Sequence, residues 1–323
     1  MVPKEYYGRL FTKEQLPVNY HPEALTLEGM IKVDKQLRCK RCYSWIEEDW
    51  QLPGGQYYCR ACIVFGRNQE GKELYYFPSK TSEIEFPVLK WFGELTPYQA
   101  KVSEKLLRTY QKQKDSLVHA VTGAGKTEMI YNIVAYVLEN KGHVAIASPR
   151  VDVCRELFLR MKRDFTCSIS LLHAESEPYD GSPLVIATTH QLLKFYQSFD
   201  LVIVDEVDAY PFVGNVMLNH AIVQAKTQTG RFIYLTATST LSLEEQVRLG
   251  TLEKHHLARR FHGNPLVLPK FFWQGRLQKS LTRDKLPRPL LYQIKKQRKS
   301  KFPLLIFFPN IAIGEKFTSI LQN

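Results

Sequence analysis

A glycine-rich turn followed by a lysine and a threonine is the stretch of this sequence best suited to chemistry. It reads AVTGAGKTEM, Ala120 to Met129. Its glycines allow backbone N–H groups to curl around phosphate oxygens at the start of a helix, whose dipole favours anions. Lys126 can then reach the β- and γ-phosphates of a nucleotide, and Thr127 can place its hydroxyl on Mg²⁺. The predicted phosphate-binding residues are those of the loop: Thr122, Gly123, Ala124, Gly125, Lys126 and Thr127.

A pair of carboxylates ends the apolar run LVIVD, where Asp205 and Glu206 begin the sequence Asp-Glu-Val-Asp. An aspartate at this position can hold the Mg²⁺ of a nucleotide, and the neighbouring glutamate can orient or deprotonate the attacking water. We therefore expect ATP and Mg²⁺ as cofactors, with Lys126, Asp205 and Glu206 as catalytic residues. Thr127 and Asp205 are the expected magnesium ligands.

Four of the six cysteines form two C-x-x-C pairs, Cys39 with Cys42 and Cys59 with Cys62. Two such pairs can place four thiolates at the corners of a tetrahedron, which is the geometry of a structural Zn²⁺ site. Because sulfur fills all four positions, none remains for water or substrate, and we expect the ion to support folding. A redox pair and unrelated cysteines are the less favoured alternatives.

Shorter polar motifs surround the phosphate loop and resemble those of superfamily-two helicases. The loop itself has Ala120 where the strict pattern has glycine, as motif I of these helicases often does. Gln99, in LTPYQ, resembles their adenine-reading glutamine. Arginine and hydroxyl groups at the ends of predicted strands suit nucleic-acid phosphates, and a Thr-Ala-Thr motif resembles the one that couples nucleotide to nucleic acid. The predicted DNA contacts are Arg150, Thr188 and Thr189, and the predicted coupling residues are Asp208, Thr236 and Thr238.

These motifs need a scaffold that brings the ends of several strands together. Apolar runs of strand length alternate with amphipathic helical segments between residues 85 and 253. Such alternation predicts a doubly wound parallel sheet with helices on both faces, and ligands gather at the carboxyl ends of its strands. The polar motifs fall at those ends. The sequence therefore predicts an α/β fold of the P-loop, RecA-like type.

The remaining residues divide around this ATP-binding lobe, 85–253. Residues 1–30 are expected to form a peripheral N-terminal segment and residues 31–70 a zinc module with a core separate from the lobe. Residues 254–301 form a predicted basic linker, and residues 302–323 are interpreted as the first strand and helix of a second RecA-like lobe. We expect the chain to be truncated inside that lobe. The sequence leaves open whether this end is natural, the result of a damaged reading frame or an experimental boundary.

Composition and charge limit the classes of protein. With 323 residues, 44% hydrophobic and 24% charged, the chain suits about two folded domains and not disorder. No apolar run approaches the ~18 residues of a membrane span, and the N-terminus lacks a signal-peptide core, so we expect a cytoplasmic protein. The net charge of +12 is concentrated between Lys254 and Lys301, where fourteen basic residues accompany one acid, Asp284. This block favours a nucleic-acid partner, with solvated linker charge as the alternative.

The combination of motifs resembles one family, the ComFA competence proteins of Gram-positive bacteria, which are superfamily-two helicases of the DEAD/DEAH type. The resemblance covers essentially the whole chain. It implies an ATP-driven motor that translocates single-stranded DNA at the inner face of the cell membrane during transformation, with the channel protein ComEC and its companion ComFC as partners. The segments that carry it are YYGRL, the four-cysteine module, LTPYQ, AVTGAGKTEM, ATTHQLL, DEVDAYPF, LTATST and PLLIFFPNI.

Two other functions stay open from the sequence. A replication-restart helicase of the PriA type shares the motor and has zinc-binding cysteines, but its cysteines follow the acidic box instead of preceding the phosphate loop. A nucleotide-dependent DNA-binding module without turnover is the second, because the later helicase motifs, with arginines that touch the γ-phosphate, have no counterpart here. On this basis we expect weak ATP binding and slow hydrolysis from the chain as given.

Overall fold

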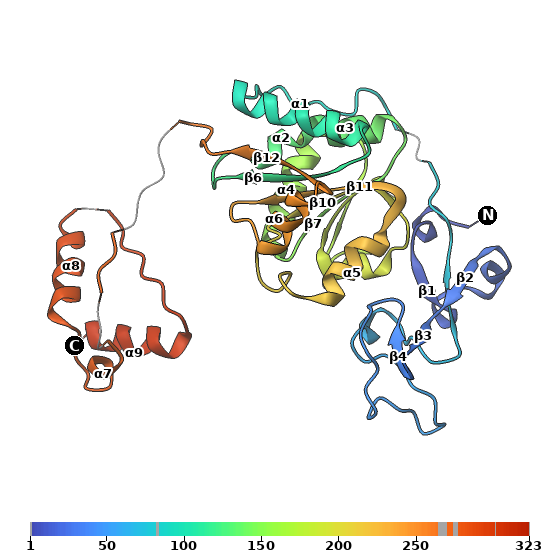
Figure 1. The fold of residues 1–323 in the computed structure, drawn as a ribbon, viewed down its shortest axis with the longest axis horizontal. Coiled ribbons are helices and arrows are strands. Elements are labelled where there is room, and N and C mark those ends of the chain that lie inside the picture. Colours follow the sequence, from blue (N-terminus) through green and yellow to red (C-terminus); the bar gives the residue numbers. More distant parts are fainter. Residues whose placement is uncertain (1, 82–83, 264–269, 274–276, 301, 323) are drawn as a thin grey trace. The chain divides into compact units, whose positions relative to one another are not determined.

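The structure is a computed structural model that describes residues 2–81, 84–263, 270–273, 277–300 and 302–322 (Figure 1). The chain divides into two compact units, Met1–Pro265 and Leu266–Asn323, and each is described by itself. The motifs of the predicted nucleotide site, zinc module and strand-end DNA contacts all lie in the first unit.

A seven-stranded sheet forms the centre of the first unit, and every paired neighbour in it runs parallel. Its strand order is β12-β6-β11-β10-β7-β9-β8. This topology confirms the predicted α/β fold of a doubly wound parallel sheet. The strands are β6 (Asp115–Ala120), β7 (Val144–Ser148), β8 (Ile169–Leu172), β9 (Leu184–Thr188), β10 (Phe199–Asp205), β11 (Lys226–Thr236) and β12 (Leu252–Leu257).

Helices cover both faces of the sheet, because successive strand residues point to opposite sides and both sides are apolar. On β6, for example, Val118 packs in one buried cluster and Leu117 in the other. One face carries α1 (Pro97–Gln111), α2 (Lys126–Met129), α3 (Tyr131–Glu139) and α4 (Val151–Asp164). The opposite face carries the 3₁₀ segment η5 (Thr189–Lys194), α5 (Val216–Ala225) and α6 (Leu241–Arg248).

The strand β12 extends the sheet past the predicted lobe boundary, since residue 253 lies inside it. It pairs in parallel with β6, so that His255 lies beside Val118. The side chain of His255 is buried, and its Nε2 lies 3.4 Å from the Thr109 hydroxyl of α1. Basic and histidine residues in LEKHHL hide this strand from a search for apolar runs.

The first residues of the chain are folded, not merely peripheral. They contribute β1 (Leu10–Thr12) and β2 (Leu25–Glu28) to a small antiparallel sheet with β5 (Glu73–Tyr76), in the order β1-β5-β2. The short 3₁₀ segment η1 (Lys4–Tyr6) precedes β1, and η2 (Lys13–Gln15) and η3 (Val18–Glu23) connect β1 to β2. A separate small core supports them, built mainly from Val2, Phe11, Leu16 and Phe77.

The cysteine-containing module is the long connection between β2 and β5. The final pair of that hairpin is Glu28 with Glu73, and the Gly29 N–H donates to the Lys72 carbonyl over 3.0 Å. Inside the connection lie the hairpin strands β3 (Met30–Val33) and β4 (Gln36–Cys39), and the 3₁₀ segment η4 (Ile63–Phe65).

This module packs against α5, which corrects the expectation that its core is separate from the lobe. The ring of Tyr43 stacks on His220 of α5 with 4.8 Å between centroids and 10° between planes. His220 Nε2 lies 2.9 Å from the Lys40 carbonyl. The four cysteines belong to one continuous buried cluster with Leu218 and other residues on this face of the sheet.

The second unit contains α7 (Leu277–Leu281), α8 (Arg288–Arg298) and α9 (Ile311–Gln322). Leu281, Leu286, Ile294 and Phe317 form its small core. Residues 302–310, predicted as a strand, have no strand conformation, whereas the helix predicted after them is present as α9. A strand needs a hydrogen-bonded neighbour, and no described segment pairs with these residues.

Among the described residues, no helix combines the length and the apolar character needed to cross a bilayer.

Candidate nucleotide site and zinc centre

The predicted nucleotide motifs meet because β6, β11 and β10 are neighbours in the sheet. The phosphate loop follows β6, Asp205 ends β10, and the Thr-Ala-Thr motif ends β11 between them. A cavity of about 580 Å³ lies at these strand ends. Its lining includes the loop residues Gly123–Glu128, together with Trp91, Glu94, Leu95, Thr96, Gln99, Arg160, Asp205 and Phe261.

The phosphate loop depends on glycine where it turns into α2. Gly125 has a φ of +73°, a left-handed conformation that side chains rarely adopt. A Cβ atom at this position would also lie 2.3 Å from Gln99 Nε2, which is a steric overlap. The following residue, Lys126, opens α2, so its backbone N–H has no partner within the helix and is available to an anion.

Gln99 ties the start of α1 to this loop. Its buried side chain accepts hydrogen bonds from the N–H and the hydroxyl of Thr96, each over 2.9 Å. The amide Nε2 donates to the Ala124 carbonyl, also over 2.9 Å. Both ends of the amide are therefore engaged, and reading an adenine edge would require Gln99 to release Thr96 or the loop.

Asp205 provides a partly buried carboxylate that lines the cavity. Burial raises the pKa of this carboxyl, while Lys126 and the Glu206 N–H act in the opposite direction. That N–H donates to Asp205 Oδ1 over 2.9 Å. A carboxylate and a hydroxyl residue, Thr127, in the lining of one cavity suit a hard divalent cation, so the residues present fit the predicted Mg²⁺.

Glu206 has a strained backbone, with a φ of +54° that is uncommon for a residue with a side chain. Such conformations persist where the surrounding structure holds them and are frequent at functional sites. Its Oε2 accepts no hydrogen bond within the described structure and lies 3.9 Å from Arg150 Nη1. The carboxylate is therefore free to accept a proton or a hydrogen bond from water.

The predicted coupling residues are in direct contact. The Thr236 hydroxyl lies 2.5 Å from Asp208 Oδ1, and the Thr238 hydroxyl donates to Asp208 Oδ2. The Thr238 N–H in turn donates to Thr236 Oγ1 over 2.9 Å. These hydrogen bonds join the end of β11 to the loop that follows Asp205 and Glu206. A displacement of that loop would therefore also displace the end of β11.

The predicted DNA contacts divide into two groups. Arg150 is exposed and is paired with Asp152, with 2.5 Å between Nη2 and Oδ2. Thr188 and Thr189 are buried, and Thr189 is 0% exposed, with its hydroxyl lacking a partner among the described atoms. In this packing the two threonines do not reach the surface, because β9 is an inner strand and η5 turns back against α5.

The four cysteines fit the predicted zinc. Their sulfur atoms all lie within 4.8 Å of one another, with 3.7 Å between Cys39 and Cys62 and 3.5 Å between Cys42 and Cys59. A tetrahedron with Zn–S bonds of about 2.3 Å has edges of roughly 3.8 Å. All four side chains are buried, as a closed structural site requires.

Two further residues beside the cysteines were not predicted from the sequence. The Asn68 amide donates to Cys39 Sγ over 3.1 Å. Arg41 is 0% exposed and donates to the Phe65 and Gly66 carbonyls, both over 2.8 Å. Four thiolates around Zn²⁺ carry a net charge of −2, so a buried guanidinium nearby offsets part of that charge. The available sequence signal for these residues is their position, with Arg41 inside the first cysteine pair and Asn68 shortly after the second.

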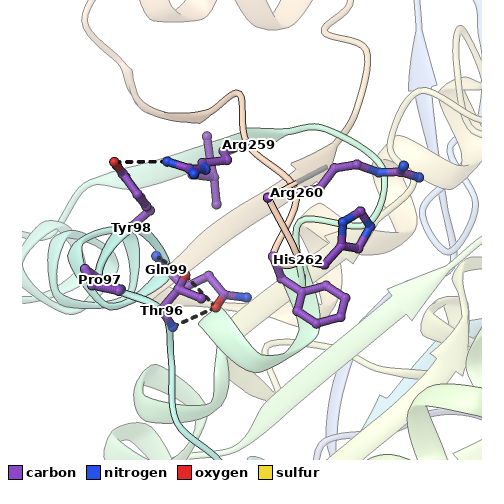
Figure 2. Close-up of a pocket in the computed structure, with 10 residues that line it drawn as sticks. Thr96, Pro97, Tyr98, Gln99, Arg259, Arg260 and His262 are labelled. Atoms are coloured by element: carbon purple, nitrogen blue, oxygen red, sulfur yellow. Dashed lines mark hydrogen bonds between the residues drawn. The ribbon is translucent and has the colours of Figure 1, made fainter. Parts of the chain in front are cut away.

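A segment after β12, which falls within the predicted basic linker, also touches the phosphate loop. Figure 2 shows part of this segment, with Arg259 and Arg260, beside the start of α1. Arg260 Nε donates to the Thr122 carbonyl over 3.2 Å, and the Phe261 N–H donates to the Gly123 carbonyl over 3.1 Å. Only the placement of β12 beside β6 brings these residues to the loop.

Comparison with known proteins gives a consistent result. A family model described as DEAD/DEAH box helicase matches residues 96–246. The curated "Competence protein ComFA" of Streptococcus pneumoniae (strain ATCC BAA-255 / R6) is 53% identical over 322 residues, covering 99% of this chain and 74% of that protein. The protein of the same name from Bacillus subtilis (strain 168) is 33% identical over 324 residues, covering 97% and 69%.

A more distant similarity covers about half of the chain. "Replication restart protein PriA" of Rickettsia prowazekii (strain Madrid E) is 23% identical over 194 residues. The match covers 55% of this chain and 29% of that protein.

Proposed function

This chain belongs to the ComFA family of competence proteins, and we propose that it is an ATP-driven motor that moves single-stranded DNA during DNA uptake. It carries the ATP-dependent DEAD/DEAH-type helicase domain of that family. The observation that carries the proposal is that Lys126, after β6, and Asp205, at the end of β10, line one cavity large enough for a nucleotide, with Glu206 directly after Asp205.

In the proposed reaction the loop N–H groups and Lys126 bind the β- and γ-phosphates of ATP. Thr127 and Asp205 would hold Mg²⁺, which would supply positive charge to offset the negative charge of the phosphates during transfer. Glu206, free of competing hydrogen bonds, orients the attacking water and accepts its proton. Each of these roles uses a residue that lines the cavity or adjoins Asp205.

The contact of Asp208 with Thr236 and Thr238 supports a role in coupling. Loss of the γ-phosphate would change the surroundings of Asp205 and Glu206, which are proposed to hold Mg²⁺ and the attacking water. Asp208 belongs to the same short loop and contacts Thr236 and Thr238. A shift of that loop would be passed to the end of β11 through hydrogen bonds. We propose that this is how hydrolysis alters the grip on DNA.

Single-stranded DNA is the proposed track, and the channel protein ComEC and its companion ComFC are the proposed partners, at the inner face of the cell membrane. Exposed Arg150 and the basic block between Lys254 and Lys301 supply groups that bind phosphates. Thr188 and Thr189 would contribute only after a rearrangement of η5. A replication-restart role is less well supported, because the cysteine module precedes the phosphate loop here.

Two substitutions test the proposal. Lys126→Ala should abolish tight nucleotide binding, because the charge on the phosphates loses its partner. Glu206→Gln should keep binding and lower hydrolysis by about 10² or more, the usual contribution of a general base. Binding of a fluorescent ATP analogue and phosphate release, each with and without single-stranded DNA, are the measurements.

Exposed residues of the same types give matched controls, Lys162→Ala on α4 and Glu139→Gln at the end of α3. Both should behave as the wild-type chain does. Equal loss of nucleotide in Lys126→Ala and Glu206→Gln would contradict the role of Glu206. Wild-type chain that binds ATP tightly but never hydrolyses it would favour a DNA-binding module without turnover, and wild-type chain that binds no ATP would refute the nucleotide site.

A further inference from the structure

A histidine near the end of β6 reaches past the last paired residues of two neighbouring strands. The parallel pairing of β6 with β11 ends at His119 and Thr236, so the strand ladder does not include Ala237. The side chain of His119 does reach that residue, because its Nε2 lies 3.2 Å from the Ala237 carbonyl oxygen. A carbonyl oxygen can only accept a hydrogen bond, so Nε2 carries the donated hydrogen.

This contact joins two parts of the candidate nucleotide site. His119 directly precedes Ala120, where the phosphate-loop sequence begins, and Ala237 is the middle residue of the Thr-Ala-Thr motif. The two threonines of that motif bond to Asp208, in the loop that follows the acidic pair. The motif is therefore held from two sides, by the acidic loop through its hydroxyls and by the phosphate-loop strand through a main-chain oxygen.

The His119 ring is partly buried, and its second nitrogen does not compete for this role. Nδ1 is buried and has no hydrogen-bond partner among the described residues. The ring lies beside that of His256 on β12, with 5.1 Å between centroids. Because β6 lies between β12 and β11 in the sheet, His256 is on the side away from the Thr-Ala-Thr motif. The orientation of the His119 ring therefore depends on its packing and on the bond to Ala237.

We propose that His119 is a positioning residue that transmits nucleotide binding at the phosphate loop to the Thr-Ala-Thr motif. This inference rests on the proposed function. Phosphates that draw the loop toward them would displace the end of β6, and the hydrogen bond from His119 would carry that displacement to the Ala237 carbonyl. This route is separate from the one through Asp208, so part of the response should remain when either route is cut.

Hydrogen–deuterium exchange in residues 236–240, with and without a non-hydrolysable ATP analogue and Mg²⁺, measures this transmission. In the wild-type chain the analogue should slow exchange there. His119→Leu keeps a side chain of similar bulk in the sheet and removes the donor. The slowing by the analogue should then be about two- to tenfold smaller, the range of one net hydrogen bond. Analogue affinity, measured by calorimetry, should stay within about twofold of wild type.

His119→Gln retains an N–H donor near the position of Nε2, so it should recover most of the response. His256→Leu is the matched control, because it replaces the neighbouring histidine on the other side of β6, and it should behave as the wild type does. A purely structural role of His119 would raise exchange in residues 236–240 equally with and without the analogue. Thermal unfolding of each variant checks that the fold is intact.

An unchanged response to the analogue in His119→Leu would overturn the proposal, and so would a His119→Gln variant that responds no better than His119→Leu. A comparable loss of analogue affinity in His119→Leu would overturn it as well, because the histidine would then be acting on nucleotide binding itself. A wild-type chain that binds no analogue would instead refute the proposed nucleotide site. A wild-type chain that binds it without any change at residues 236–240 would refute the coupling role of the motif, so these failures are distinguishable.

Discussion

Asp205 and Glu206 are neighbours in the chain but have different surroundings. The Asp205 carboxyl is partly buried near Lys126, and this burial raises its pKa. Glu206 has a left-handed backbone, and its Oε2 has no hydrogen-bond donor among the described residues and lies 3.9 Å from the Arg150 guanidinium. A carboxylate in the cavity wall suits a metal, and an unbonded carboxylate oxygen suits water, so the two residues can divide the chemistry between them.

Asp205→Asn is expected to stabilise the nucleotide-free chain and to remove its Mg²⁺-dependent nucleotide binding. Folding raises the pKa of Asp205, so the folded chain favours the neutral carboxyl. The free energy of unfolding is therefore highest at a pH below the pKa of Asp205 in the unfolded chain, and it decreases as the pH rises through the pKa in the folded chain. At pH 7 the carboxylate therefore lowers the free energy of unfolding. Removing the charge should raise that free energy by about 0.5–2 kcal/mol.

Thermal unfolding between pH 5 and 8 checks this, and the advantage of Asp205→Asn should shrink as the pH falls. Asp152→Asn is the control, because the exposed Arg150 beside it lowers the pKa of Asp152. That variant should gain nothing at pH 7. A midpoint for Asp205→Asn at or below that of wild type at pH 7 would show that the buried charge is fully compensated.

At the scale of elements, most of the large sheet could be predicted from the sequence. β7, β9 and β10 are short apolar runs buried on both faces, and the helices between them have apolar residues at helical spacing. β12 was missed because its charged residues lie at the edge of the sheet, where only one side of the strand is paired. The small sheet was missed because β5 pairs with strands far away in the sequence, and local patterns carry no such pairing.

The residues of the candidate site likewise divide into those that the local sequence predicts and those that depend on tertiary packing. Residues whose roles depend on local sequence, Lys126 in the loop and Asp205 at a strand end, came together as predicted. Gln99 and Thr189 depend on packing that the sequence does not reveal. The Gln99 amide donates to the phosphate loop, and Thr189 is buried at the start of η5. Arg259 and Arg260 looked like part of a charged linker, because their neighbours in space come from β6 and α1.

The zinc module and α5 should respond together when the metal is lost. Cys59→Ser removes one of four ligands, and structural Zn²⁺ contributes on the order of 10 kcal/mol to the folding of small modules. Because His220 contacts Tyr43 and Lys40, loosening the module also leaves part of α5 uncovered. Hydrogen–deuterium exchange in residues 30–70 and in Val216–Ala225 should therefore rise at least about tenfold.

Elemental analysis should find one Zn²⁺ per wild-type chain and none in Cys59→Ser. Cys167→Ser, which changes a partly buried cysteine outside the cluster, is the control and should keep both the metal and the protection. If exchange increased in the module but not in α5, the contact at His220 would not contribute to the stability of α5.

At the scale of the whole chain, positive charge and exposed aromatic rings occur in the same stretch of sequence. The basic block supplies Lys295, Lys296, Arg298 and Lys299 at the end of α8. Phe271 and Trp273 are 93% and 96% exposed. Basic groups with unburied rings suit single-stranded nucleic acid, in which phosphates bind the charges and bases stack on the rings.

DNA binding should accordingly be tolerant of sequence and sensitive to salt. If about four phosphates are neutralised, affinity for single-stranded DNA should fall roughly 50-fold between 50 and 200 mM salt. Replacing Lys295 and Lys296 with alanine should reduce the slope of log affinity against log salt, whereas replacing the exposed Lys101 and Lys105 of α1 should not. Fluorescence anisotropy with oligothymidine and with a mixed sequence measures both properties, and an affinity indifferent to salt would contradict the electrostatic account.

The zinc module enters and leaves the fold at one point, where Glu28 pairs with Glu73 and Gly29 bonds Lys72. In topological terms it is the connection of a hairpin whose two strands end at directly paired residues. Loop-closure entropy rises only logarithmically with length, so a connection of this size costs about 3 kcal/mol more than a minimal turn before the metal folds it. A short turn could therefore replace the whole module without changing the register of β2 and β5, and the cost of that exchange would fall on α5, whose contact with Tyr43 and Lys40 would be lost.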